Sequence, residues 1–229
     1  MFPSAARAAV LLLGLTVLWT ATACDSSRPP QSAQDSGGPE SEPEEGVIVA
    51  VGDSLTAGLG LPEAEAYPAI LEQLLAERGF NYRVVNAGIS GETSSGARTR
   101  IGWIMKLEPD IVILETGAND GLRGIEPKLV EENIDHIITQ LLQEDITVVL
   151  AGMQMVTNLG PAYVSSFNRV YPKLADRHGV IFMPFFLQDV AMNTALNQAD
   201  GIHPNAAGYE VIAENLLPFV EEAIKETAR

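Results

Sequence analysis

Residues 47–55 read Val-Ile-Val-Ala-Val-Gly-Asp-Ser-Leu and place a serine directly after a short apolar run. The run from Val47 to Gly52 is rich in β-branched residues, which predicts a buried strand. Gly52 then eases a tight turn of the backbone. Ser54 is therefore expected at a strand-to-helix turn.

The rest of the chain alternates between short apolar runs and helical patterns. Four further runs predict buried strands: 82–86, 111–115, 146–151 and 180–183. Apolar residues at three- and four-residue spacing predict helices over 67–78, 94–107, 127–143, 163–178 and 206–226. The stripe expected on the helix 127–143 comprises Leu129, Ile134, Ile137, Ile138, Leu141 and Leu142. Strands that alternate with helices indicate a parallel sheet covered on both faces, a doubly wound α/β domain.

The N-terminal part of the sequence has the composition of an export signal followed by a linker. One positive charge precedes an apolar run over 8–20, and small residues come directly before Cys24. This pattern predicts a signal peptide over 1–23. A membrane anchor is the alternative, although the run is short for a span of about 20 residues. The stretch 24–46 is polar and acidic and predicts a flexible tether, so the folded domain is expected over 47–229.

Cys24 is the only cysteine of the chain, so no disulfide can form within it. Its place after Ala-Thr-Ala resembles a bacterial lipoprotein signal, in which the cysteine becomes the lipid-modified N-terminus. Ala21 departs from that pattern, which usually has Leu there. The alternative is ordinary cleavage that leaves a free thiol. We expect lipidation of Cys24 and a periplasmic, membrane-anchored protein of the bacterial cell envelope.

The charge balance excludes some classes of partner. The chain has 14 basic and 30 acidic residues, a formal net charge of −16, which would repel a phosphate backbone. Nucleic acid is therefore not expected as a partner. The three histidines show no metal-ligand spacing, so neither a metal nor another cofactor is expected. We interpret His136 and His178 as structural residues of helices.

Polar residues gather in the segments after the predicted strands, where the site of a doubly wound sheet lies. The loop 86–92 reads Asn-Ala-Gly-Ile-Ser-Gly-Glu, and 116–121 reads Thr-Gly-Ala-Asn-Asp-Gly. Glycines let backbone N–H groups approach a substrate, and an Asn amide can donate a further hydrogen bond. These loops are therefore candidates for binding a substrate oxygen.

The segment before the last helix reads Asp200-Gly-Ile-His203-Pro204. Pro204 restricts His203 to an extended conformation. Asp200 can reach Nδ1 of His203 across one turn while Nε2 faces Ser54, which needs such a base because serine is a poor nucleophile at its own pKa. Each feature alone is more often a helix cap or a turn. Together, at the loops of one sheet, they predict a serine-nucleophile site.

The blocks Gly52-Asp-Ser-Leu55, Gly91, Asn119 and Asp200-x-x-His203 resemble, in order, the four sequence blocks of the SGNH, or GDSL, hydrolases. The resemblance extends from Val47 to the C-terminus. Further segments are similar to the bacterial periplasmic thioesterase, lysophospholipase and arylesterase branch: 86–91, 117–124, 171–175, 184–186 and 200–205. The fold that this implies is a flavodoxin-like three-layer α/β/α sandwich with a five-stranded parallel sheet.

The resemblance also assigns roles to individual residues. It implies Ser54 as nucleophile, His203 as base and Asp200 as the residue that orients the base. It implies an oxyanion hole formed by the N–H groups of Ser54 and Gly91 and by the Asn119 side chain. The residues expected on the substrate side are Asp53, Asp120, Gly121, Leu122, Ile125 and Met155. For Asp53, capping of the next helix is preferred to a direct catalytic part.

Several other side chains are candidates for an acyl pocket, although core packing is favoured for most of them. They are Met153, Met155, Met183, Met192, Phe182, Phe185 and Phe186. The stretch 153–163 is shorter than in the family members that the chain resembles. The preferred acyl length therefore stays open.

The resemblance implies a serine esterase that cleaves small aryl or acyl esters through an acyl-enzyme on Ser54, with thioesters and lysophospholipids as further substrates. A monomer is expected. Two alternatives stay open: a deacetylase of O-acetylated glycans in the same family, and a non-catalytic binding module on the same fold. Another class of α/β serine hydrolase is not favoured, because Thr56 stands where a G-x-S-x-G elbow has glycine.

Overall fold

A five-stranded parallel sheet forms the centre of the folded domain. The computed structural model describes residues 44–155 and 159–227, so the predicted signal peptide, Cys24 and the predicted tether up to residue 43 lie outside the described residues. The sheet has the strand order β2-β1-β3-β4-β5. The strands are β1 Gly46–Gly52, β2 Tyr82–Gly88, β3 Ile111–Glu115, β4 Thr147–Ala151 and β5 Ile181–Met183. The predicted strands are confirmed to within two residues at each end.

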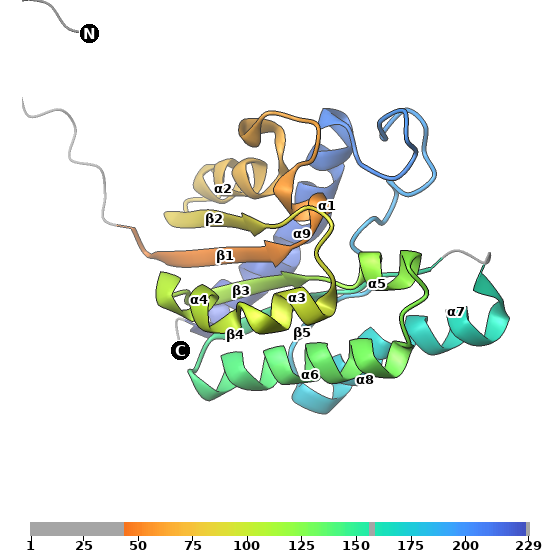
Figure 1. The fold of residues 1–229 in the computed structure, drawn as a ribbon. Coiled ribbons are helices and arrows are strands. Elements are labelled where there is room, and N and C mark those ends of the chain that lie inside the picture. Colours follow the sequence, from red (N-terminus) through yellow and green to blue (C-terminus); the bar gives the residue numbers. More distant parts are fainter. Residues whose placement is uncertain (1–43, 156–158, 228–229) are drawn as a thin grey trace, which may run out of the picture. The chain divides into compact units, whose positions relative to one another are not determined.

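Helices cover both faces of the sheet. They are α1 Ser54–Ala57, α2 Tyr67–Glu77, α3 Ser94–Thr99, α4 Ile101–Ile104, α5 Ala118–Leu122, α6 Pro127–Gln143, α7 Pro161–Asn168, α8 Val170–His178 and α9 Ala206–Thr227, with short 3₁₀ turns η1 Glu63–Glu65 and η2 Met105–Leu107. Figure 1 shows α2 and α9 on one face and α3, α6 and α8 on the other. This confirms the predicted three-layer α/β/α sandwich.

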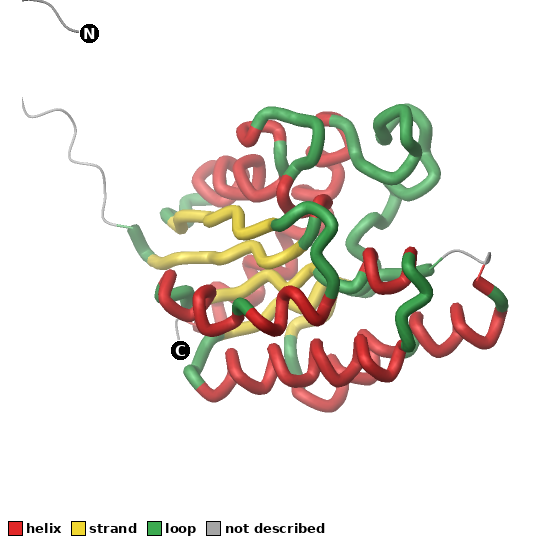
Figure 2. Tube along the Cα trace, in the orientation of Figure 1, coloured by secondary structure: helices red, strands yellow, loops and turns green. Residues whose placement is uncertain are grey.

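The core lies between these layers and fixes the register of the strands. Val49, Ile113 and Val149 have no exposed surface, because the central strands are covered on both faces. Gly52 pairs with Gly88 of β2, so the carboxyl ends of β1 and β2 lie side by side. Figure 2 shows the loops that follow the strands gathered at this edge of the sheet. This edge is where a doubly wound sheet binds its ligands.

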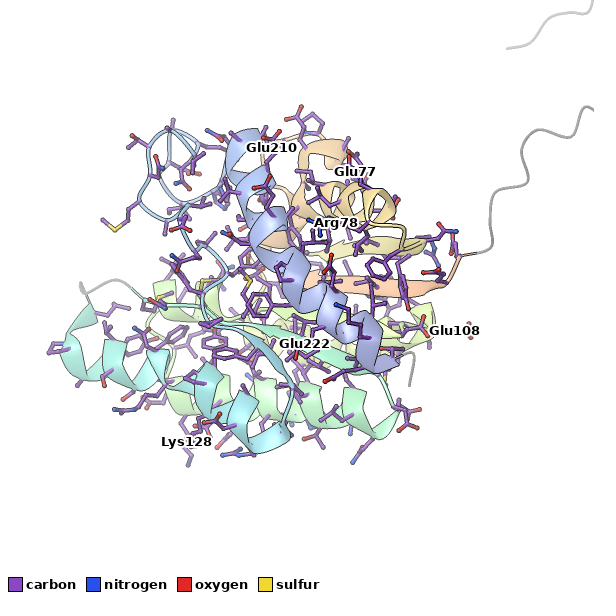
Figure 3. All side chains as sticks on the ribbon, turned by 180° about the vertical axis from the view of Figure 1, so that it is seen from behind. Glu77, Arg78, Glu108, Lys128, Glu210 and Glu222 are labelled. Atoms are coloured by element: carbon purple, nitrogen blue, oxygen red, sulfur yellow. The ribbon has the colours of Figure 1, made fainter. Side chains whose placement is uncertain are left out.

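The outer faces of α2 and α9 are charged. Figure 3 labels Glu77 at the end of α2 and Arg78 directly after it, together with Glu210 and Glu222 on α9. Arg78 forms an ion pair with Glu221 at 3.2 Å, which joins the two helices at the surface. Among the residues that the structure describes, no helix is long and apolar enough to cross a membrane.

Two of the predicted helices are divided in the structure. The segment 94–107 forms α3, α4 and η2, and 163–178 forms most of α7 and all of α8. Gly96 and Gly102 disfavour one continuous helix over 94–107, because glycine has a low helix propensity. The helix expected directly after the Ser54 turn is confirmed as the short α1. The short α5 was not predicted, because so few residues show no periodicity.

The buried stripe of α6 differs from the predicted one at its ends. Leu129 and Leu142 are 42% and 37% exposed, whereas Val130 and Asn133 are buried. The inner positions 134, 137, 138 and 141 are buried as predicted. Val130 lies one helical turn before Ile134 on the same face, which is why it replaces Leu129 in the stripe.

Candidate active site

Ser54 is the first residue of α1 and follows the buried end of β1. Asp53 caps this helix, since its Oδ1 accepts a hydrogen bond from the Leu55 N–H at 2.9 Å. Gly88 of β2 lies so close beneath α1 that a Cβ there would collide with the Ala57 backbone. Ser54 itself is 8% exposed. The turn that carries Ser54 is therefore held by a cap and by close packing.

His203 and Asp200 form a hydrogen-bonded chain with Ser54. Nε2 of His203 lies 2.9 Å from Ser54 Oγ, and Nδ1 lies 2.6 Å from Asp200 Oδ2. Asp200 Oδ1 accepts hydrogen bonds from the N–H groups of Ile202 at 2.9 Å and His203 at 3.0 Å. Hydrogen bonds from the backbone and then the ring of His203 lower the pKa of Asp200 well below its ordinary value. The carboxylate is therefore ionised at neutral pH and oriented toward the imidazole.

The loop between β5 and α9 brings His203 to Ser54, which is far away in the sequence. The Gln198 N–H donates to the His203 carbonyl at 2.8 Å, and the Gln198 side-chain amide donates to the Leu59 carbonyl at 2.8 Å. Leu59 follows α1, so Gln198 ties the loop that carries His203 to the segment after the Ser54 turn. The Asn205 side chain accepts from the Gly208 N–H at 3.0 Å and caps α9.

Asn119 of α5 is joined to the turn that carries Ser54 through Asp53. Its Nδ2 donates to Asp53 Oδ2 at 2.9 Å. Burial raises the pKa of Asp53, and the hydrogen bonds from the Leu55 N–H and the Asn119 amide act against that shift. Gly91 lies in the loop after β2 with a φ of 79°, and its carbonyl accepts from Arg123 Nη2 at 2.8 Å.

A cavity of about 380 Å³ opens beside Ser54 and His203. Of the residues predicted on the substrate side, Asp53, Leu122 and Met155 line it. Of the acyl-pocket candidates, Met153, Met155, Met192 and Phe185 line it, whereas Met183 and Phe186 are buried in the core. Lining residues that were not predicted are Leu55, Ala118, Gln154, Leu187, Ala191, Asn197, Gly201 and Ile202. Most of these lie in the β5–α9 loop, whose irregular sequence shows no periodic signal.

Asp120 was expected on the substrate side, but in the structure it faces the protein interior instead of the cavity. It is fully buried, and its oxygens accept hydrogen bonds from the N–H of Ser94 at 2.7 Å and from its hydroxyl at 2.6 Å. Gly121 and Ile125 do not line the cavity either. Gly121 packs against the Met155 sulfur, where a Cβ would collide, and the Ile125 carbonyl accepts from the Tyr163 hydroxyl at 2.7 Å. These three residues therefore contact other parts of the protein and do not line the cavity.

The chain belongs to the GDSL-like Lipase/Acylhydrolase family, whose model matches residues 50–211. The matched range contains the hydrogen-bonded Ser54, His203 and Asp200 together with Asn119. The protein is therefore a hydrolase that acts on ester bonds. In the part of the chain that the structure describes, no group of three or more His, Cys, Asp or Glu side chains could hold a metal ion.

Named relatives and solved structures agree with this membership. The chain is 40% identical to "Esterase TesA" of Pseudomonas aeruginosa over 76% of this chain and 87% of that protein. It is 36% identical to "Arylesterase" of Vibrio mimicus over 73% and 84%. It is 34% identical to "Thioesterase 1/protease 1/lysophospholipase L1" of Escherichia coli over 73% and 79%.

Two solved structures extend the comparison to the fold. A crystal structure of TesA has a TM-score of 0.74 at 39% identity and covers 77% of this chain and 99% of its own. The SGNH-hydrolase family esterase AlinE4 has a TM-score of 0.68 at 39% identity, with 80% and 99% covered.

Proposed function

We propose that the protein is a serine esterase that cleaves carboxylic esters through an acyl-enzyme on Ser54. The observation that supports this most is the hydrogen-bonded chain from Asp200 through His203 to Ser54 Oγ, with contacts of 2.6 and 2.9 Å. These hydrogen-bonded side chains lie beside a largely apolar cavity that can hold the acyl or aryl part of a substrate. A nucleophile, a base and a residue that orients the base are the parts that acyl transfer by serine needs.

The proposed reaction begins with proton transfer. Nε2 of His203 accepts the Ser54 proton as Oγ attacks the carbonyl carbon, and Asp200 stabilises the imidazolium that forms. His203 then donates this proton to the leaving alkoxide, which gives the acyl-enzyme. His203 then takes a proton from a water molecule, whose oxygen attacks the acyl carbon. When the bond from that carbon to Ser54 Oγ breaks, His203 returns the proton to Oγ and the acid is released.

The charge on the tetrahedral intermediate requires hydrogen-bond donors. We assign this role to the N–H groups of Ser54 and Gly91 and to Nδ2 of Asn119. A single well-aimed donor of this kind contributes about 10²- to 10³-fold to kcat. One Asn119 N–H is held by Asp53 at 2.9 Å, which leaves the other free to serve the intermediate.

The cavity indicates the class of substrate. Among the described residues, its lining comes mainly from Met, Leu, Phe, Ile and Ala side chains, and His203 is the only basic residue in it. An ester with a modest apolar acyl or aryl group fits such a cavity. The names of the relatives, which include an arylesterase and a thioesterase/lysophospholipase, support aryl esters, thioesters and lysophospholipids as the first classes to test.

The first experiment compares the purified full chain with Ser54→Ala on p-nitrophenyl esters of increasing acyl length. Turnover by the wild type and its near-complete loss in Ser54→Ala and His203→Ala are expected. Near-normal turnover by either variant would sink the proposed mechanism. Release of acetate from acetylated glycans, without hydrolysis of longer esters, would instead favour a deacetylase.

For the N-terminal segment we propose export and lipidation at Cys24, with a periplasmic, membrane-anchored product. The support is the apolar run over 8–20 followed by small residues and a single cysteine. Mass spectrometry of the mature N-terminus after expression in a bacterium tests this. An N-terminal Cys24 without lipid, or no cleavage before it, would remove the proposal.

A further inference from the structure

A buried carboxyl lies directly beneath the nucleophile turn and is not used in the proposed reaction. Glu115 is the last residue of β3, the strand beside β1, and has no exposed surface. Its Oε2 accepts a hydrogen bond from the Thr56 hydroxyl at 3.0 Å and from the Asp53 N–H at 3.3 Å. These two donors lie on either side of Ser54 in the sequence. Glu115 therefore contacts the turn before and after the nucleophile.

The packing around this contact leaves no spare room. A Cβ built on Gly52 would collide with both the Thr56 hydroxyl and the Glu115 carboxyl, and it would lie 2.7 Å from the Glu115 carbonyl oxygen. The Thr56 hydroxyl also lies 3.3 Å from the Tyr67 hydroxyl. Glycine at position 52 thus lets the carboxyl lie against the backbone that enters the turn.

A series of hydrogen bonds links Glu115 to the proposed oxyanion donors. Glu115 holds the backbone of Asp53, and the Asp53 carboxylate in turn holds the Leu55 N–H at 2.9 Å and the Asn119 amide at 2.9 Å. A shift of this turn would move Ser54 Oγ, the Ser54 N–H and the Asn119 amide together. Misplacement of about 1 Å can cost about 10²-fold in rate.

We propose that Glu115 is a positioning residue for the esterase reaction, which fixes the Ser54 turn and, through Asp53, the Asn119 amide. This inference rests on the proposed roles of Ser54 and Asn119. Glu115 does not touch the substrate in this proposal, since it lies behind the turn and not in the lining of the cavity.

The surroundings of Glu115 favour the neutral acid. In the described ranges no Lys, Arg or His hydrogen-bonds to the carboxyl, and Oε1 has no hydrogen-bond partner. Burial, and then the negative charge of Asp53, raise the pKa of Glu115 well above its ordinary value. Glu92 adds to this effect, although it is paired with Arg100 at 2.6 Å. The phenols of Tyr67, Tyr171 and Tyr209 also interact electrostatically with Glu115.

A neutral acid that only accepts hydrogen bonds through Oε2 can be replaced by an amide but not by a hydrocarbon. Glu115→Gln keeps an acceptor oxygen at the same length, whereas Glu115→Leu removes the acceptor that the Thr56 hydroxyl and the Asp53 N–H share. Thr56→Val and Thr56→Ser form a second pair, because only serine keeps the hydroxyl. Ile111→Val, at the other end of β3, is a control for lost stability alone.

The test measures kcat and KM for a p-nitrophenyl ester, together with the rate at which a fluorophosphonate labels Ser54 in the folded protein. We expect kcat and the labelling rate of Glu115→Leu and Thr56→Val to fall about 10- to 100-fold with KM within about threefold. We expect Glu115→Gln and Thr56→Ser to stay within about threefold of the wild type, and Ile111→Val to lower only the melting temperature.

Each alternative outcome bears on a different claim. Normal kcat and labelling in Glu115→Leu would overturn the inference, and so would a loss in Glu115→Gln as large as in Glu115→Leu. If Glu115→Leu does not fold, the Thr56 pair decides, and equal rates for valine and serine would overturn the inference. Absence of Ser54 labelling in the wild type would instead overturn the proposed function, and the positioning role with it.

Discussion

Replacing Asn119 by alanine removes two interactions at once, and the two have different consequences. One Nδ2–H holds Asp53 at 2.9 Å, and the other is the proposed donor to the oxyanion. Loss of an oxyanion donor costs about 10²- to 10³-fold in kcat, or about 2.7 to 4 kcal/mol of transition-state stabilisation. Because this donor acts mainly in the transition state, KM should change little.

Folding should weaken in the same variant. Asp53 is 1% exposed and would keep only the Leu55 N–H as a donor to its carboxylate. A buried acceptor left without its partner costs about 1 to 3 kcal/mol, so the free energy of unfolding should fall by that amount. Urea denaturation measures this loss, and steady-state kinetics on a p-nitrophenyl ester measure the loss of kcat.

Asp53→Asn is the matched control for Asn119→Ala. It keeps the proposed oxyanion donor but replaces one carboxylate oxygen of residue 53 with an NH2 group. If that NH2 group lies toward Asn119, two hydrogen-bond donors face each other and the Asn119 amide has to rotate. We expect kcat to fall by less than in Asn119→Ala. A kcat for Asn119→Ala within threefold of the wild type, in a protein that is folded at the assay temperature, would refute the oxyanion role of Asn119.

Three further predictions follow from single contacts. Asp200→Asn should lower kcat by up to about 10⁴-fold with an unchanged melting profile, as measured by steady-state kinetics and thermal unfolding, since the amide no longer fixes the tautomer of His203. Burial raises the pKa of Glu115, so the folded protein keeps a proton that the unfolded chain releases above about pH 4.5. The free energy of unfolding should therefore fall as pH rises above that value, by up to about 1.4 kcal/mol per pH unit. Urea midpoints at pH 5 to 7 should show this decline weakened in Glu115→Gln, and parallel declines would contradict it. Phe186→Ala should cost about 3 to 5 kcal/mol in the same assay, since Phe186 is fully buried with its ring edge-on to Tyr67 at 5.3 Å.

The strands were predictable because each is a short apolar run with polar or glycine-rich flanks. The helices α2, α6 and α9 were predictable from periodicity, whereas the break between α3 and α4 was not. Gly96 and Gly102 lower the helix propensity of this segment, but the place of the break coincides with tertiary contacts. Arg100 stands between the two helices, and its guanidinium bonds to Glu92 at 2.6 Å and to the Gly52 carbonyl at 3.4 Å. No local propensity encodes those partners.

The orientation of the acidic side chains at the site also could not be predicted from the local sequence. Asp120 belongs to a glycine-rich loop and was predicted to face the substrate, but the Ser94 hydroxyl and N–H turn it inward. Glu115 ends an apolar run and gave no signal of its own. Whether a carboxylate faces solvent, substrate or core depends on donors that are distant in the sequence. The motif residues Ser54 and His203 were found because their local context is distinctive.

The two parts of the site differ in their exposure, and the proposed reaction accounts for this difference. Ser54 and Asp53 lie on a tightly packed turn, whereas the Asp200 side chain is 46% exposed. Such an exposed carboxylate would hold a partner weakly through charge alone. Here hydrogen bonds from the backbone of Ile202 and from the backbone and ring of His203 fix it instead. Acylation requires a rigid nucleophile and rigid oxyanion donors, whereas deacylation requires water to reach His203. A packed turn opposite an open, hydrogen-bonded loop meets both requirements.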